Sequence, residues 1–351
     1  MRVLQAMAGA TLGGAESFFV DLALALSRAE LVPEILMREN LQRTTALRKA
    51  GLNVLELPFN NEFSDLHTRV SFAKAIQSYN PDIVLTWMSR ATSFCPKSNL
   101  AQGRKNFIHV GWLGGYYNLS TYRNCDYLIA LTPDLLTYFA AGGWTAARTV
   151  CLPVFTSAPD PQSVAAARSL YDTPEAVPLA LALGRFHENK GFDVLIAALK
   201  EVPSLYLWLA GAGPLKSSLE SWIASAGVGQ RVRLIDWQDD VTPLMLAADF
   251  FVCPSRHEPF GRVIIEAWAH RLPVIATASQ GPKQLIVDHN NGLLTPIDDV
   301  GALANAMQHL VDNQSLRESL VQAGYETFLN FYEEKLVIKA YLEFFARILK
   351  T

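Results

Sequence analysis

The stretch FFVCPSRHEPFGRVIIEAWA, residues 250–269, decides the fold of this chain. It begins with a short apolar run at Phe250–Pro254, which predicts a buried β-strand, and continues into a turn that contains proline and glycine. A helical pattern starts at about Gly261. A buried strand that leads through a short turn into a helix is typical of parallel α/β sheets.

The same alternation of apolar strands and amphipathic helices runs along the whole sequence. Such continuous apolar strands predict parallel sheets that are covered on both faces. Their number exceeds one ordinary sheet and favours two doubly wound domains of about six strands each. The expected strands are Arg2–Met7, Pro33–Met37, Asn53–Leu57, Asp82–Trp87, Asn106–Val110, Asp126–Leu131, Leu179–Gly184, Tyr206–Gly211, Val232–Asp236, Phe250–Pro254, Pro273–Thr277 and Gly292–Thr295.

A segment rich in proline, serine, alanine and aspartate at residues 152–178 predicts the boundary between the two domains. Residues 1–153 hold 14 Lys and Arg against 11 Asp and Glu, a net charge of +3, which leaves −6 for the rest of a chain whose net charge is −3. The basic first half is consistent with an anionic surface partner, and equally with chance scatter of surface charge.

The composition excludes several classes of protein. Half of the 351 residues are apolar and 18% are charged, which is too apolar for a disordered chain. Lys and Arg number 30 against 33 Asp and Glu, which argues against a broad basic surface for nucleic acid. Mean hydropathy is +0.15, yet no apolar run reaches the about 18 residues of a membrane span. Without a signal-peptide pattern or metal-ligand spacing of its cysteines, we expect a cytoplasmic protein with reduced thiols.

The turn and helix start of the opening stretch have the features of an anion site. Backbone N–H groups at Gly261, Arg262 and Val263 are free at a helix N-terminus, and the helix dipole adds to their attraction. Two carboxylates accompany them, Glu258 in the turn and Glu266 about a turn and a half into the helix. Because carboxylates only accept hydrogen bonds, they suit a hydroxyl-rich ligand such as a sugar or a ribose. Ordinary turn and surface residues are the alternative.

A second cluster, GRFHENKG at residues 184–191, also follows a strand and leads into a helix. Arg185 and Lys190 stand five residues apart in it, where both can converge on one phosphate group. Two solvated cations of an ordinary loop are the alternative.

Two further strand-to-helix turns contain glycines. In LGGAE at residues 12–16, Gly13 and Gly14 let the backbone approach a phosphate or a sugar closely, although the spacing is not G-x-G-x-x-G. The turn GAGP at residues 211–214 contains Gly213. A tight turn without a ligand is the alternative for each.

Trp237 and His109 are single residues at the ends of predicted strands. Trp237 follows the strand Val232–Asp236 and is placed to stack on a nucleobase, with a core or rim position as the alternative. His109 lies at the end of the predicted strand Asn106–Val110. Because ligands bind at the carboxyl ends of parallel strands, this position favours a functional role for His109. A structural histidine is the alternative there.

Together these segments resemble the retaining glycosyltransferases of family 4, the glycosyl transferases group 1. The pattern E-P-F-G-x-x-x-x-E-A at Glu258–Ala267 is similar to the signature of that family. So are G-R-x-x-x-x-K-G at Gly184–Gly191, G-x-G-P at Gly211–Pro214 and G-G-A-E at Gly13–Glu16. The segments come in the order of the family, and the resemblance covers nearly the whole chain.

The resemblance implies the GT-B fold, in which two Rossmann-like, doubly wound parallel-sheet domains face a cleft. We expect an acceptor-binding domain at residues 1–153 and a nucleotide-sugar-binding domain at 154–330. A C-terminal helix at 331–351 is expected to cross back to the first domain. Apolar residues between Phe328 and Leu349 leave that helix little polar face, so it should be buried across the domains or, alternatively, contact lipid.

The resemblance also implies roles for individual residues. Arg185 and Lys190 match the diphosphate-binding pair, Glu258 the residue that contacts the donor sugar, and Glu266 the ribose-binding carboxylate. His109 lies roughly where many members have an active-site histidine. The expected catalytic residues are His109, Glu258, Arg185 and Lys190, and the expected donor-binding residues are Gly13, Gly14, Arg185, Lys190, Gly213, Trp237, Glu258, Phe260, Gly261, Arg262, Val263 and Glu266.

Two positions depart from the family pattern. Gln284 stands where the family often has a carboxylate, which puts some donor contacts in doubt. Pro153 and Val154 stand where an asparagine is common before the second domain, which concerns the hinge.

The expected activity is metal-independent transfer of a hexosyl-type group, with retention, from a nucleotide diphosphate sugar to a hydroxyl of a glycan or lipid-linked acceptor. No cofactor, metal or nucleic acid is expected, and the sequence contains no Asp-x-Asp. The resemblance also implies a role in polysaccharide or lipopolysaccharide synthesis at the inner face of the cytoplasmic membrane. Acceptor or transient membrane contact is expected at the aromatic segment Gly111–Tyr117 and at the terminal helix. A sugar-nucleotide epimerase of the same architecture and a non-enzymatic bilobal sugar-binding protein are the alternatives.

Overall fold

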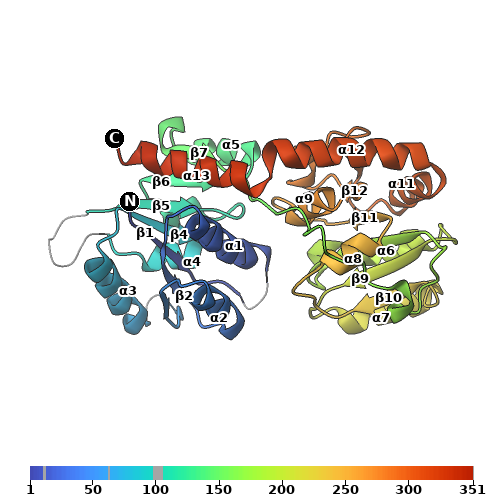
Figure 1. Ribbon diagram of the computed structural model, residues 1–351, viewed down its shortest axis with the longest axis horizontal. Coiled ribbons are helices and arrows are strands. Elements are labelled where there is room, and N and C mark those ends of the chain that lie inside the picture. The colour runs from blue at the N-terminus through green and yellow to red at the C-terminus, as the bar shows by residue number, and fades with distance from the viewer. Residues whose placement is uncertain (11–12, 62–63, 98–105, 351) are drawn as a thin grey trace. The chain divides into compact units, whose positions relative to one another are not determined.

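The computed structural model describes residues 1–10, 13–61, 64–97 and 106–350 (Figure 1). The chain divides into two compact units. Unit 1 comprises Met1–Val154 together with Glu334–Thr351, and unit 2 comprises Phe155–Glu333. Each unit is a parallel β-sheet with helices packed on it, so each is described in turn.

The sheet of unit 1 has the strand order β3-β2-β1-β4-β5-β6-β7, and every pairing in it is parallel. The order reverses between β1 and β4, as in doubly wound sheets. Its strands are β1 (Val3–Met7), β2 (Glu34–Met37), β3 (Val54–Glu56), β4 (Ile83–Trp87), β5 (Ile108–Trp112), β6 (Tyr127–Ala130) and β7 (Thr149–Cys151). Its helices are α1 (Gly14–Arg28), α2 (Leu41–Lys49), α3 (Leu66–Tyr79), α4 (Met88–Phe94), α5 (Pro133–Ala141) and α13 (Glu334–Ile348), with short 3-10 turns at Leu119–Tyr122 and Ala146–Arg148.

The sheet of unit 2 has the order β10-β9-β8-β11-β12-β13, again with parallel pairings throughout. Here the order reverses between β8 and β11. The strands are β8 (Leu179–Leu183), β9 (Tyr206–Ala210), β10 (Val232–Ile235), β11 (Phe250–Cys253), β12 (Val274–Thr277) and β13 (Leu293–Thr295). The helices are α6 (Phe192–Leu199), α7 (Lys216–Ala226), α8 (Thr242–Ala247), α9 (Arg262–Ala269), α10 (Pro282–Leu285), α11 (Val300–Asp312) and α12 (Gln314–Phe331), with 3-10 turns at Arg168–Tyr171 and Glu188–Lys190.

The expected pair of Rossmann-like parallel sheets is confirmed, and all twelve predicted strands are present. The short strand β7 was not predicted. The fifth strand was predicted at Asn106–Val110 but runs from Ile108 to Trp112. It continues through Gly111 because a Cβ atom there would lie 2.9 Å from the Tyr122 ring and 3.0 Å from Leu128, so glycine is used for close packing within the sheet and not for a turn.

The expected C-terminal helix at 331–351 corresponds to α13, but the apolar segment counted from Phe328 is divided between two helices. Helix α12 ends at Phe331 in unit 2, and α13 begins at Glu334 in unit 1. The break is fixed by a backbone contact, because Thr156 N–H donates to the Tyr332 carbonyl at 3.2 Å and Thr156 pairs with Glu333. Each helix therefore buries its own apolar stripe, and neither is apolar all round.

Helix α13 covers the aromatic core of unit 1. Its Tyr341 is fully buried and accepts a hydrogen bond from Trp112 Nε1 at 3.1 Å. Trp112 in turn packs on Trp87 with ring centroids 4.2 Å apart. Trp112, at the start of the segment Gly111–Tyr117, is thus core and not the contact surface expected from the sequence. Among the described residues, no helix combines the length and apolar character that crossing a bilayer requires.

Candidate active site

The carboxyl edge of the unit 2 sheet gathers most of the predicted site residues. Strand β8 lies between β9 and β11, so the chain leaves the sheet in opposite directions on its two sides. Crevices of this kind at the carboxyl ends of parallel strands are where open α/β sheets bind ligands. The loops that follow β8, β9, β11 and β12 all start at this edge.

The loops after β8 and β9 are joined through their backbones. Phe186 N–H donates to the Ala212 carbonyl at 2.9 Å, and Leu215 N–H donates to the Phe186 carbonyl at 3.1 Å. A Cβ atom at Gly211 would lie 1.9 Å from the Gly184 carbonyl oxygen, and one at Gly213 would lie 2.5 Å from the Phe186 oxygen. These two glycines are required because no side chain fits between the loops.

The loops after β8 and β11 are joined in the same way. Gly191 has φ +62°, and a Cβ atom there would lie 2.1 Å from the Pro254 carbonyl oxygen. His257 N–H donates to the Asn189 carbonyl at 3.2 Å. The segments 184–191 and 255–261 are therefore held in a fixed register, which brings their charged side chains together.

Lys190 and Glu258 form an ion pair at the junction of these segments. Lys190 Nζ lies 2.5 Å from Glu258 Oε2, with the two side chains 22% and 14% exposed. Burial disfavours the charged ammonium, but Glu258 and the nearby Cys253 outweigh it and raise the pKa of Lys190. The lysine therefore stays charged at neutral pH. Its side chain crosses Gly184, where a Cβ atom would lie 3.3 Å from Lys190 Cε.

Helix α9 begins immediately after this pair, as predicted. Gly261 caps it with φ +101°, and Phe260 is buried before it. The amides of Arg262 and Val263 occupy the first helical positions, where no intrahelical acceptor exists. Glu266 forms an ion pair with Arg262, with Arg262 Nε 2.9 Å from Glu266 Oε1.

Arg185 and Trp237 take less constrained positions at the same sheet edge. The Arg185 side chain is exposed, and within the described ranges it makes no hydrogen bond or ion pair. Trp237 follows β10, is half-buried, and donates from Nε1 to Asp239 Oδ1 at 3.1 Å. Neither the Arg185 nor the Trp237 side chain is part of the buried core.

Two features of this edge were not predicted. The Arg256 guanidinium forms ion pairs with Asp193 at 2.5 Å and with Asp298 at 2.6 Å. It also donates a hydrogen bond to the Glu188 carbonyl at 2.9 Å. In the loop after β12, Ser279 Oγ and Gln280 Oε1 are buried, and in the described chain they have no hydrogen-bond partner. Buried polar atoms of this kind often mark a place where a ligand or water binds.

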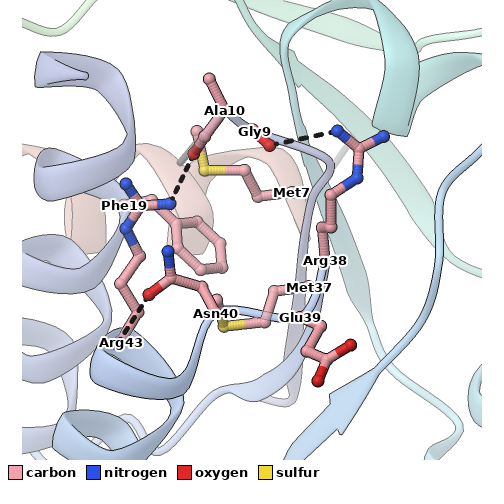
Figure 2. A pocket seen from close by; sticks show the side chains of 9 residues that line it. All are labelled: Met7, Gly9, Ala10, Phe19, Met37, Arg38, Glu39, Asn40 and Arg43. Atoms are coloured by element: carbon pink, nitrogen blue, oxygen red, sulfur yellow. Dashed lines mark hydrogen bonds between the residues drawn. The ribbon is translucent and has the colours of Figure 1, made fainter. Parts of the chain in front are cut away.

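The glycine turn of unit 1 is built around a buried carboxylate. Glu16 Oε1 accepts the Ala10 N–H at 2.7 Å, and a Cβ atom at Gly13 would lie 2.2 Å from Glu16 Oε2. Gly14 begins α1 with open space around it. A cavity of about 230 Å³ adjoins this turn at the ends of β1 and β2, with Arg38 and Arg43 among its lining residues (Figure 2).

The predicted position of His109 at the end of its strand is wrong. It is the second residue of β5 and is only 2% exposed. Its Nε2 lies 2.8 Å from Thr86 Oγ1, and its backbone N–H donates to Asp126. The extension of β5 through Gly111 moves the strand end three residues beyond it. A catalytic role for His109 stays a prediction.

Comparison with known proteins agrees with this geometry. Residues 166–327 match the family model described as glycosyl transferases group 1. The chain is also 34% identical, over 95% of its length and 96% of the relative, to the lipopolysaccharide core biosynthesis glycosyltransferase LpsE of Rhizobium meliloti (strain 1021). The chain belongs to the group 1 glycosyltransferases.

This glycosyltransferase is also 32% identical to the lipopolysaccharide core biosynthesis glycosyltransferase LpsD of the same organism, over 96% of both chains. Two solved structures show the same fold. A glycosyltransferase from Rickettsia africae ESF-5 matches with a TM-score of 0.87 and 22% identity, over 100% of this chain and 99% of that one. Anabaena Alr3699/HepE in complex with UDP-glucose matches with a TM-score of 0.86 and 19% identity, over 99% and 100%.

Proposed function

We propose that this glycosyltransferase moves a hexosyl-type group from a nucleotide diphosphate sugar to a hydroxyl of a glycan or glycolipid acceptor, with retention at the anomeric carbon. The observation that carries the proposal is the Lys190–Glu258 pair beside the N-terminus of α9. A permanent cation, helix N-terminal amides and a hydrogen-bond-accepting carboxylate lie together where the strand order of the sheet reverses. A sugar diphosphate needs this combination.

The costly event in such a transfer is the growth of charge on the leaving diphosphate. Lys190, Arg185 and the α9 amides at Gly261–Val263 would stabilise that charge, since preorganised donors act most strongly where charge develops. Because these groups supply the positive charge, the proposal needs no metal ion and no cofactor. Glu258 would accept hydrogen bonds from the hydroxyls of the transferred sugar.

Retention follows from a same-face exchange at the anomeric carbon. The bond from that carbon to the diphosphate oxygen breaks, and the bond to the acceptor oxygen forms on the same face. The acceptor proton passes to the leaving phosphate oxygen, so no nucleophile from the protein is needed. His109 is proposed to act on the sugar only through its surroundings, because its ring is buried within unit 1.

The remaining predicted residues are proposed to hold the nucleotide. Glu266 would bind the ribose after exchanging its contact with Arg262, and Trp237 would stack on the base. Phe260 would shape the turn beside the sugar, and the narrow turn at Gly213 and the turn at Gly13 and Gly14 would let the backbone approach the diphosphate. The complexes of the fold relative HepE with UDP and with UDP-glucose support a donor of this class.

The names of the full-length relatives support a place in lipopolysaccharide core synthesis. We propose that unit 1 binds the acceptor and that unit 2 binds the donor. The protein would act in the cytoplasm, with peripheral contact at the inner face of the cytoplasmic membrane, where lipid-linked glycans are extended.

A donor screen followed by product analysis tests the proposal. Thermal shift with UDP-, GDP- and ADP-sugars should reveal one donor that stabilises the protein by mass action. With that donor and a lipopolysaccharide core acceptor, NMR should show a product with the anomeric configuration of the donor. An inverted product, or a new sugar nucleotide formed without acceptor, would overturn it. Donor binding with no transfer to any core acceptor would favour a binding protein and would equally overturn it.

A further inference from the structure

A second cluster of polar side chains lies within unit 1, after the carboxyl ends of β3 and β4. A cavity of about 440 Å³ opens there. Among the described residues, every side chain that lines it is polar, and five of these six carry an amide or a hydroxyl group. The lining residues are Asn60, Asn61, Ser89, Arg90, Ser93 and Thr121. Amides and hydroxyls can both donate and accept, which suits the hydroxyl groups of a sugar.

Two arginines converge on one backbone carbonyl beside this cavity. Arg90 Nη1 donates to the Phe59 carbonyl at 3.3 Å, and Arg38 Nη2 donates to the same oxygen. Phe59 itself has φ +45°, a strained conformation for a buried phenylalanine. Phe59 N–H donates to Thr68 Oγ1 at 3.1 Å, so hydrogen bonds hold both the N–H and the carbonyl of this residue.

Arg38 also reaches the cavity at the ends of β1 and β2 (Figure 2). There its other nitrogens donate to the Pro58 carbonyl at 3.1 Å and the Gly9 carbonyl at 3.4 Å. Arg43 lines the same cavity and donates to the Ala10 carbonyl at 2.8 Å. Arg38, Arg43 and Arg90 thus all lie along this sheet edge, and together they are called the cationic rim.

Of the three arginines, Arg43 has an acidic neighbour: burial lowers the pKa of Arg43, and Glu16 opposes that shift. In the part of the chain that is described, neither Arg38 nor Arg90 pairs with a carboxylate. Burial and the positive charge of Arg90 both lower the pKa of Arg38. Glu39 lines the cavity of Figure 2, but its carboxylate points away from the Arg38 guanidinium. The Asp65 carboxylate accepts hydrogen bonds from the backbone N–H of Asn60 and from Thr68.

We infer that Arg38 and Arg90 bind an anionic oxygen group of the acceptor, a phosphate or a carboxylate, while the polar cavity binds the hydroxyls of the sugar that carries it. Carbonyl partners hold both guanidinium groups in place without cancelling their charge, so the site is organised before the anion arrives. This inference rests on the proposed function and deepens it, because it gives the acceptor a chemical class: a charged sugar unit.

Calorimetric titrations with three monosaccharides test the inference. Glucose, glucose 6-phosphate and glucuronate share a hydroxyl-rich ring and differ in charged group. The titrations use the Lys190→Ala protein, so that the diphosphate site of unit 2 does not capture the phosphate. We expect at least one anionic sugar to bind about tenfold tighter than glucose, since hydrogen bonds to charged groups are the strong ones. Glucose 6-phosphate alone would identify a phosphate site, and glucuronate alone a carboxylate site.

Added variants locate the preference. Arg90→Gln, at an exposed side chain, should reduce it about fivefold or more with little change in melting temperature. Arg2→Gln is the matched control. Arg2 precedes β1 and so lies at the amino ends of the strands, away from the carboxyl ends where the cavity lies. Equal binding of all three sugars would overturn the inference, as would an unchanged preference in Arg90→Gln. These titrations need no donor, so they stand or fall separately from the donor screen.

Discussion

The two sheets of this glycosyltransferase have the same doubly wound order but build their carboxyl edges differently. In unit 2 the loops touch backbone to backbone, with Gly191, Gly211 and Gly213 in contacts that admit no side chain. In unit 1 the loops are bridged by arginine side chains that donate to carbonyls around cavities of about 230 and 440 Å³. A backbone-built edge tolerates little change in its residues, whereas a side-chain-built edge can be altered without moving the chain. Under the proposed function, the nucleotide diphosphate of the donor would bind at the backbone-built edge of unit 2. The acceptor, which is the variable substrate, would bind at the side-chain-built edge of unit 1.

The largest effect is expected from Lys190→Ala, which removes the charge at the centre of the unit 2 edge. Transfer should fall by about 10²- to 10³-fold, the usual result of deleting one preorganised donor to a developing anion. The measurement is kcat with the donor found by screening. Lys216→Ala removes an exposed lysine of the same unit and should leave kcat unchanged. Equal activity of the Lys190 variant and this control would contradict the assignment.

The next largest effect is expected at Gly211 of unit 2, in comparison with Gly14 of unit 1. Gly211→Ala should lower the free energy of unfolding by about 3 kcal/mol, because the new Cβ atom would collide with the Gly184 carbonyl. Gly14→Ala should change it by less than about 0.5 kcal/mol, because the space at the start of α1 is open. Urea unfolding of both variants provides the comparison. Similar losses at the two positions would remove the distinction between the units.

Asp65→Ala should lower the free energy of unfolding of unit 1 by about 1 to 2 kcal/mol, because Asp65 caps α3 through Thr68 and also accepts the backbone N–H of Asn60. Burial opposes the charged carboxylate, but the hydrogen bonds from Thr68 and Asn60 outweigh it and lower the pKa of Asp65. Its contribution is therefore present above about pH 4 and lost as pH falls through the lowered pKa. Unfolding curves of wild type and variant should converge in acid. A constant difference at every pH would exclude the charged cap.

The smallest effect is expected from Tyr341→Phe. It removes the hydroxyl that accepts the Trp112 Nε1–H and leaves that buried donor unpaired, at a cost of about 1 kcal/mol. Chemical unfolding followed by tryptophan fluorescence measures the loss. Phe345→Leu removes a ring that packs on Tyr341 but keeps the hydroxyl, so a shift of tryptophan emission in the Tyr341 variant alone would report the lost hydrogen bond.

The sequence predicted unit 2 better than unit 1 for a physical reason. Its loops carry motifs that resemble a known family, so Lys190 and Glu258 were both expected at the donor site. Their ion pair with each other was not predicted, because it joins two loops that are 68 residues apart. The cationic rim of unit 1 combines Arg38, the turn at Phe59 and Arg90, which share no motif and meet only in the folded sheet.

Two features that the sequence did not predict have similar causes. His109 was placed at a strand end because Gly111 was taken as the start of a loop, whereas it packs inside β5. The break between α12 and α13 contains neither glycine nor proline, and it is fixed by the pairing of Thr156 with Glu333. Contacts between residues far apart in sequence set both features, and periodicity does not report such contacts.

The assignment of α13 to unit 1 has a consequence for biosynthesis. Unit 1 is a discontinuous domain, with all of unit 2 inserted between Val154 and Glu334. While the ribosome is still translating unit 2, the nascent first domain lacks the helix that covers Trp112 and exposes an aromatic surface. We therefore expect a fragment ending at Val154 to bind chaperones or aggregate, and the separately supplied segment Glu334–Ile348 to restore its solubility in trans.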